Sequence, residues 1–162
     1  MEYDIKTILY ATDLGPKGPE VANHAVGVAR RFDARIHAIH VTEPMSRFTN
    51  TLVEKYLPRE SVDTFHVQAL NEARQALEKR ANAYFQEHLF DEDDVEHLFA
   101  DIRVVEGSPA TTILKEAKRI GADLIVLGDR GYSPLNELLI GSVAHKVMMT
   151  TRIPVLLVPI SE

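Results

Sequence analysis

Apolar runs of strand length alternate with segments of helical periodicity along this chain, and this alternation limits the folds open to it. Five runs have the length and composition of strands, at residues 5–11, 34–41, 99–105, 124–127 and 153–158. Between them, apolar residues recur three and four positions apart, as they do on one face of a helix. Such alternation predicts a parallel sheet with helices on both faces, joined by right-handed crossovers. The run 124–127 has no polar residue, which is typical of a strand buried on both sides.

The ends of several helices can also be predicted. The first helix follows a turn cluster at residues 12–16. Ser108 followed by Pro109 indicates the start of another helix, because serine caps helices and proline fits the first helical position. That helix should end near Gly121, and a further helix should cover residues 141–150.

The central part of the chain is less regular. Residues 42–60 form an irregular insertion, which carries four large apolar residues at helical spacing: Met45, Phe48, Leu52 and Tyr56. They could form a lid over a ligand, a face for a partner or, as we favour, a cover for the core. A long helix follows, with an apolar face made of Val62, Phe65, Ala69, Ala73, Leu77 and Tyr84. The acidic run 91–96 lacks the spacing and central glycine of a calcium loop, so we interpret it as a solvated turn.

Composition excludes several classes of function. The chain has 162 residues, 45% of them hydrophobic, and we expect a single domain over residues 1–162. It has no cysteine, which excludes disulfides, thiol catalysis and thiolate metal sites. A formal charge of −6 argues against broad electrostatic binding to nucleic acid. The acidic start lacks the features of a secretory signal, and no apolar stretch approaches the ~20 residues of a membrane span, so we expect a soluble cytoplasmic protein.

A set of glycines follows the fourth predicted strand. Gly128 comes directly after the run 124–127, Gly131 lies three positions further on, and after nine intervening residues the chain reads Gly141 and Ser142. Glycine at the end of a buried strand lets the backbone approach a ligand closely. A Gly-Ser pair at the start of the next helix offers free N–H groups to an anion. The spacing therefore predicts a site for a phosphate chain.

The predicted sheet also gives this site a position. In doubly wound sheets the ligand crevice lies beyond the carboxyl ends of the strands, where the winding direction reverses. If the strand order is 3-2-1-4-5, that crevice falls between the first and fourth strands. Thr12 and Asp13 end the first strand, and the glycine loop ends the fourth. Two segments far apart in the sequence should thus meet at one site.

These residues resemble the universal stress proteins, in the branch of that family that binds nucleotides. The resemblance covers nearly the whole chain. It is carried by ILYATD at residues 8–13, IHV at 39–41, GDRG at 128–131 with the nine-residue gap to Gly141 and Ser142, VAHKV after them, and IPVLLVP at 153–159.

The resemblance implies a Rossmann-like sheet of order 3-2-1-4-5 that forms a homodimer through its last strand, from Ile153 to Val158. It also implies bound ATP, with or without Mg²⁺. Asp13 would serve the ribose and adenine side, and Val41 would line the adenine pocket. The nucleotide-binding residues implied in this way are Ala11, Thr12, Asp13, Val41, Leu127, Gly128, Arg130, Gly131, Gly141, Ser142 and Val143.

Two residues in the glycine loop depart from what a phosphate site favours. Asp129 places a carboxylate where phosphate would approach, which is repulsive unless the side chain points outward or binds Mg²⁺. Arg130 could offset that charge. Pro134 stiffens the loop on its way to the helix, which could help or hinder the binding of phosphate.

For several single residues, a structural role is an alternative to a role in binding. Asp13 could cap a turn, as aspartate often does after a strand. His37 and His40 lie three apart on a strand and so face opposite sides, which argues against a shared metal ion and favours packing or surface roles. His145 lies one helical turn past Gly141 and could approach a terminal phosphate, but we favour a half-exposed helix residue.

The sequence also limits the chemistry. It has no GxxxxGK[ST] motif, so it lacks the lysine and the Ser/Thr magnesium ligand of dedicated nucleotide hydrolases. We therefore expect an ATP-binding regulatory dimer with slow or no hydrolysis, in which the loop 129–140 is the candidate switch. Binding of AMP or cyclic AMP is the first alternative, and a nucleotide-independent dimeric scaffold is the second. An adenylyl transferase lacks support, because no SGG-type or HIGH-type motif is present.

Overall fold

The computed structural model of the chain describes residues 3–43, 96–129 and 140–160, and part of the segment 44–95. In that segment the described residues are Lys55, Thr64, 67–69, 71–72, 75–76, 78–79 and Ala83, and all of them have helical backbone. Of the apolar face predicted over residues 62–84, only Ala69 is described, and it is exposed. The predicted insertion residues Met45, Phe48, Leu52 and Tyr56 and the acidic run as far as Asp94 lie outside the described residues.

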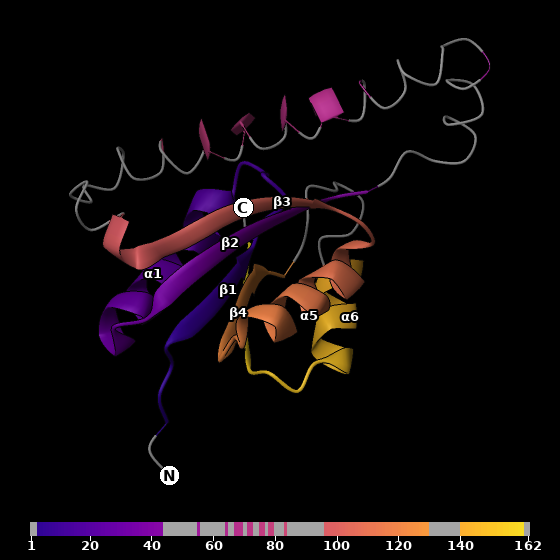
Figure 1. The fold of residues 1–162 in the computed structure, drawn as a ribbon. Helices are drawn as coiled ribbons and strands as arrows, with labels where there is room; N and C mark the ends of the chain where they lie inside the picture. The colour runs from indigo at the N-terminus through magenta and orange to yellow at the C-terminus, as the bar shows by residue number, and fades with distance from the viewer. Residues whose placement is uncertain are drawn as a thin grey trace.

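Five strands form one parallel sheet, shown in Figure 1. They are β1 (Thr7–Ala11), β2 (Arg35–Thr42), β3 (Phe99–Glu106), β4 (Leu124–Gly128) and β5 (Val155–Val158). Their order in the sheet is β3-β2-β1-β4-β5, which confirms the predicted order. In the central strand, Tyr10 pairs with Ala38 of β2 on one side and with Val126 of β4 on the other.

The first and last strands are shorter than predicted, and side-chain hydrogen bonds are found where each of them begins. The backbone N–H groups of Lys6 and Thr7 both donate to Asp123 Oδ2 at 2.9 Å, and β1 begins only at Thr7. Before β5, the N–H of Ile153 donates to Thr151 Oγ1 at 2.9 Å, and Pro154 has no N–H to give to a strand ladder. Side-chain oxygens thus bind N–H groups at the first residue of β1 or just before the two strands.

Helices cover both faces of the sheet. Helix α1 (Gly18–Phe32) lies on one face, and α5 (Pro109–Ile120) and α6 (Ser142–Thr150) lie on the other (Figure 1). Helix α5 begins and ends as predicted, with Ser108 as its N-cap residue in an extended conformation and Gly121 at its C-cap with φ of 64°. This left-handed conformation carries no Cβ penalty in glycine. The side chain of Ser108 makes no capping hydrogen bond.

Alternate side chains of the central strands enter two separate cores. In β1, Ile8 and Tyr10 pack in the core beneath α1, and Leu9 packs in the core beneath α5 and α6. In β4, Val126 belongs to the first core and Ile125 to the second. These strands are buried on both faces, as their unbroken apolar runs predicted.

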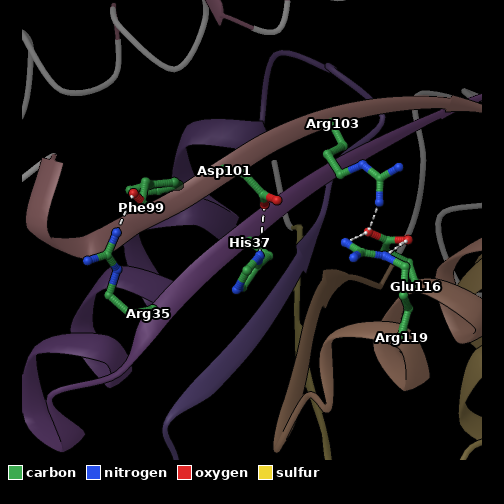
Figure 2. A network of polar contacts seen from close by, with 7 residues as sticks. All are labelled: Arg35, His37, Phe99, Asp101, Arg103, Glu116 and Arg119. Carbon is green, nitrogen blue, oxygen red and sulfur yellow. Dashed lines mark hydrogen bonds and ion pairs between the residues drawn. The ribbon is translucent and has the colours of Figure 1, made fainter.

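A polar network lies where α5 meets the outer strands, as Figure 2 shows. Glu116 of α5 is only 8% exposed and accepts hydrogen bonds from Arg103 of β3 and from Arg119 of its own helix. Nearby, His37 Nδ1 lies 2.8 Å from Asp101 Oδ1, across the β2–β3 pair. The network joins a helix to the edge of the sheet.

The network shifts the pKa of its central carboxylate. Hydrogen bonding from Arg119, and then from Arg103, lowers the pKa of Glu116 below its ordinary value of 4.5, although burial opposes this. The same contact raises the pKa of Arg119. Glu116 is therefore ionised in the folded protein at neutral pH.

Among the described residues, the structure has no helix that is both long enough and apolar enough to span a membrane.

Candidate functional site

The winding of the sheet reverses at β1. From this central strand the chain goes to β2 on one side, and β4 adjoins β1 on the other side. The carboxyl ends of β1 and β4 therefore lie side by side at the edge of the sheet where ligands bind in folds of this type (Figure 1). The strands that the two predicted segments follow are therefore neighbours in the sheet, as expected.

The segment after β1 is held in one conformation by short-range hydrogen bonds. The N–H of Thr12 donates to the carbonyl of Ile39 in β2 at 3.0 Å, and Thr12 Oγ1 accepts from the N–H of Leu14 at 3.1 Å. Asp13 Oδ1 accepts from the N–H of Gly15 at 2.8 Å. Leu14 takes up a positive φ of 62°. The turn-capping interpretation of Asp13 is thus confirmed, and the turn fixes the direction of its carboxylate.

His40 holds the same segment from the neighbouring strand. Its Nδ1 lies 2.9 Å from the carbonyl oxygen of Thr12. Since a carbonyl oxygen only accepts, Nδ1 carries the proton, and in the neutral ring Nε2 is left as an acceptor. His37 contacts Asp101 instead, so the two histidines have separate partners, as their strand spacing predicted. No sequence signal pointed to the contact of His40 with Thr12, because it depends on the register between β1 and β2.

Val41 follows His40 at the end of β2. It is half-buried and packs against the core beneath α5 and α6. Ala11 and Leu127, which end the buried parts of β1 and β4, are buried in the same core. The three predicted residues thus contribute to one core, at or near the carboxyl ends of β1, β2 and β4.

Asp129 follows the last residue of β4 and joins three segments. Its N–H donates to the carbonyl of Val158 in β5, at 2.9 Å, and its own carbonyl accepts from the N–H of Gly141 at 2.6 Å. Its Oδ1 accepts from the N–H of Ile160 at 2.9 Å. The Asp129 carboxylate, which we expected near phosphate, is therefore bound through Oδ1 to the backbone beyond β5.

Helix α6 begins beside this residue. Gly141 is its N-cap, and since its N–H is donated to Asp129, our expectation of a free N–H at Gly141 is wrong. Helix geometry leaves the N–H groups of Ser142, Val143 and Ala144 without an acceptor inside the helix. These three groups, together with the positive end of the helix dipole, form a suitable anion site.

The conformation of Gly141 does not itself require glycine. Its φ of −59° and ψ of 151° are accessible to any residue. The reason for glycine at this position is therefore the one inferred from the sequence. Without a side chain, the backbone lets a ligand approach closely.

Some predicted residues lie outside the described residues. They are Arg130, Gly131, Pro134 and the rest of the loop as far as residue 139. His145 is described and lies exposed on α6, where its N–H bonds to the carbonyl of Gly141. In the described ranges, no group of three or more histidine or acidic residues could hold a metal ion.

This architecture is an α/β fold with a doubly wound parallel sheet, in which the N-terminus of α6 lies beside the end of β4 at the switch point. Comparison of the sequence with known families identifies the family of the chain. The chain belongs to the universal stress protein family, because the sequence profile described as "Universal stress protein family" matches residues 4–159.

Similar proteins of this family come from archaea and bacteria. Universal stress protein MJ0531 of Methanocaldococcus jannaschii is 32% identical over 153 residues, which cover 94% of this chain and 81% of that protein. Universal stress protein YxiE of Bacillus subtilis is 30% identical over 152 residues, covering 93% and 97%.

Solved structures give the same result for the fold. The structure of MJ0577, also from M. jannaschii, superposes with a TM-score of 0.67 at 26% identity and covers 98% of both chains. A universal stress protein solved in complex with cAMP superposes with a TM-score of 0.59 at 19% identity, covering 96% of this chain and 97% of that one.

Proposed function

We propose that this chain is an ATP-binding regulatory protein of the universal stress protein family that acts as a homodimer, with slow or no hydrolysis. One observation carries the proposal. The first turn of α6 has three N–H groups without acceptors inside the helix, and Asp129 fixes that turn against the end of β4. The turn of Thr12 and Asp13 ends the neighbouring strand.

Each part of the site suits one part of the nucleotide. The N–H groups of Ser142 and Val143 would bind phosphate oxygens, with Gly128 and Gly141 allowing close approach of the backbone. Asp13 would bind the ribose, and Val41 would pack against adenine. Ala11, Thr12 and Leu127 would line the site. Arg130 and Gly131 are included in the proposed site because they belong to the sequence motif. Any Mg²⁺ would arrive with ATP, bound mainly by the phosphates.

The net charge of the chain agrees with a small site of this kind. With a formal charge of −6, the surface as a whole does not attract a polyphosphate. Binding would depend on the oriented backbone dipoles at the start of α6, which act over a short range. We therefore expect the affinity for ATP to depend only weakly on salt, compared with a protein that binds phosphate through a basic surface.

The test is isothermal titration calorimetry with ATP, on the unaltered chain and on Gly141→Val. The valine side chain would occupy the space that phosphate needs at the N-cap of α6, and the backbone angles there, φ −59° and ψ 151°, are accessible to valine. We expect the variant to fold normally and to lose ATP binding. Gly27→Ala is the matched control, because Gly27 is exposed on α1 and a Cβ added there meets nothing within 4 Å. Full affinity in Gly141→Val would refute the assigned site.

Adenosine monophosphates are the alternative ligands. The observation in their favour is the related structure with bound cAMP. A thermal-shift series with ATP, ADP, AMP and cyclic AMP ranks the four, since a ligand at 100 times its Kd adds about 2.7 kcal/mol to the stability of the folded state. If cyclic AMP or AMP gives the largest shift, ATP is the wrong nucleotide. If none of the four shifts the melting point, the nucleotide-independent scaffold takes its place.

The proposed dimer uses the open edge of β5. The carbonyls of Pro154 and Val158 both bond toward β4, at the N–H groups of Ile125 and Asp129. Because the bonding direction alternates along a strand, Leu157 directs its N–H and carbonyl to the open edge. These groups are the ones that a second copy would pair with.

Two variants at one position test this edge. Leu157→Pro removes the outward N–H and the leucine side chain, whereas Leu157→Ala removes only the side chain beyond Cβ. Sedimentation velocity should give a monomer for the proline variant and a dimer for the alanine variant and the unaltered chain. A dimer of unchanged stability in Leu157→Pro would exclude this edge from the interface.

Slow hydrolysis is tested by phosphate release from bound ATP. The chain lacks a phosphate-loop lysine, so we expect release close to that of a protein-free control. Multiple turnovers well above that control would make the protein an enzyme and contradict this part of the proposal.

A further inference from the structure

Asp129 forms hydrogen bonds both with the start of α6 and with the backbone beyond β5. Its carbonyl binds the N–H of Gly141 at 2.6 Å, and its Oδ1 binds the N–H of Ile160 at 2.9 Å. Its own N–H extends the ladder between β4 and β5, through the carbonyl of Val158. Three backbone segments are thus joined through a single residue with few rotatable bonds.

The contact with Gly141 positions the proposed phosphate site. Gly141 is the N-cap of α6, so the carbonyl of Asp129 sets where the first turn of that helix begins. A shift of this turn toward a bound anion would pull on the Asp129 backbone through a short hydrogen bond.

The contact with Ile160 connects the same residue to the sheet edge. Ile160 follows β5 directly after Pro159, and its half-buried side chain packs against the core beneath α1. The carboxylate of Asp129 therefore holds a segment whose far side is anchored in the core on the opposite face of the sheet. Hydrogen bonds to charged acceptors are stronger than those between neutral groups, so aspartate suits this position.

We propose that Asp129 is a positioning residue that couples nucleotide binding at α6 to the order of the β5 edge strand and the residues that follow it. The proposal rests on the proposed function, because it takes the nucleotide to bind at the first turn of α6. Coupling of this kind is reciprocal, so whatever orders the end of β5 also favours the nucleotide.

Two variants separate the hydrogen bond from the charge. Asp129→Asn keeps an oxygen acceptor for the N–H of Ile160 and removes the negative charge, whereas Asp129→Ala removes both. Asp123→Ala is the matched control, because Asp123 also binds backbone N–H groups, those of Lys6 and Thr7, but before β1 and away from α6.

The readout is amide hydrogen exchange at Ile160, measured by NMR with and without saturating ATP. In the unaltered chain and in Asp129→Asn, ATP should slow exchange at Ile160. In Asp129→Ala, exchange without nucleotide should be about tenfold to a hundredfold faster, as expected for loss of a hydrogen bond to a charged group. ATP should no longer slow it. Asp123→Ala should speed exchange at Lys6 and Thr7 and leave the effect of ATP on Ile160 intact.

The outcomes distinguish this inference from the proposed function. If ATP does not bind to the unaltered chain, both are refuted. If ATP binds but leaves exchange at Ile160 unchanged, or slows it equally in Asp129→Ala, the coupling alone is refuted. Failure of Asp129→Asn to preserve the effect would overturn the role of the hydrogen bond as its carrier.

Discussion

Replacing Glu116 by glutamine tests the link between α5 and the edge of the sheet. Glu116 Oε1 lies 2.6 Å from Arg103 Nη1 and 2.6 Å from Arg119 Nη2, and Oε2 lies 3.0 Å from Arg119 Nε. Glutamine has nearly the same shape but turns an NH₂ group toward these donors. One acceptor and the negative charge are lost, while the two guanidinium groups remain.

The size of the effect follows from the burial of the three side chains. Hydrogen bonds between charged groups contribute about 1.5–3 kcal/mol each when they are shielded from water. The Glu116 side chain is 10% exposed, but Arg103 and Arg119 are 42% and 53% exposed, so water can solvate them in the variant. We therefore expect a loss of about 2 kcal/mol in the free energy of unfolding, well below the sum of the three bonds. For a protein of this size that corresponds to a fall of about 4–8 °C in Tm.

The pH dependence gives a sharper test than the size alone. The pKa of Glu116 is lowered on folding, mainly by the hydrogen bond from Arg119, so its ionised form is bound more strongly in the folded state. The stabilisation is complete above the ordinary value of 4.5 and is lost as the pH falls through the lower, folded-state pKa. The difference between the unaltered chain and Glu116→Gln should therefore be constant near neutral pH and shrink below 4.5.

Equilibrium urea unfolding, followed by circular dichroism across this pH range, measures the difference. Glu20→Gln is the control, because Glu20 pairs with Lys17 at 2.8 Å in an exposed i, i+3 contact that should contribute less than about 0.5 kcal/mol. Equal stability of Glu116→Gln and the unaltered chain at neutral pH would refute the reasoning. So would a difference that persists unchanged at acid pH, since it could not come from the ionised carboxylate.

Four further substitutions test the packing, the strand ends and the helix backbone, each by urea unfolding. Val147→Ala removes two methyl groups from a fully buried site on α6 and should cost about 2 kcal/mol, whereas a cost near zero would mean that α6 is loosely packed. Asp123→Ala leaves two backbone N–H groups before β1 without their acceptor and should cost about 1–2 kcal/mol, and an unchanged midpoint would show that water replaces it freely. Gly121→Ala should destabilise by about 1 kcal/mol because of the φ of 64°, whereas Gly27→Ala on α1 should stabilise by about 0.5–1 kcal/mol, and effects of the same sign would contradict the backbone argument.

The parts of the fold that follow from local pattern were predictable. The alternation of strands and helices predicted a parallel sheet, and its order, β3-β2-β1-β4-β5, agrees with the one that the family resemblance implied. The start of α5 at Pro109 and its end at Gly121 also agree, because capping depends on a few adjacent residues. The ends of β1 and β5 were less predictable, since side-chain oxygens of Asp123 and Thr151 bind the N–H groups that precede these strands.

The candidate site was predictable in position and less so in its contacts. Strand order placed β1, which Thr12 and Asp13 follow, next to β4, as expected. The partner of the Gly141 N–H was missed, and so was the contact between Asp129 and Ile160, which lie 31 residues apart. The contact of His40 with Thr12 was missed for the same reason, as it joins residues 28 apart.

The sequence by itself determined which segments become strands and helices, which of their faces are apolar, and the order of the elements along the chain. These properties arise from the period of the side chains and from turn residues, so neighbours in the sequence are enough to specify them. Only the tertiary structure decided that Asp129 binds Gly141 and Ile160, and that Glu116 binds Arg103. Such pairs depend on strand register and on how far each helix lies along the sheet, and these are set by the packing of the two cores as a whole.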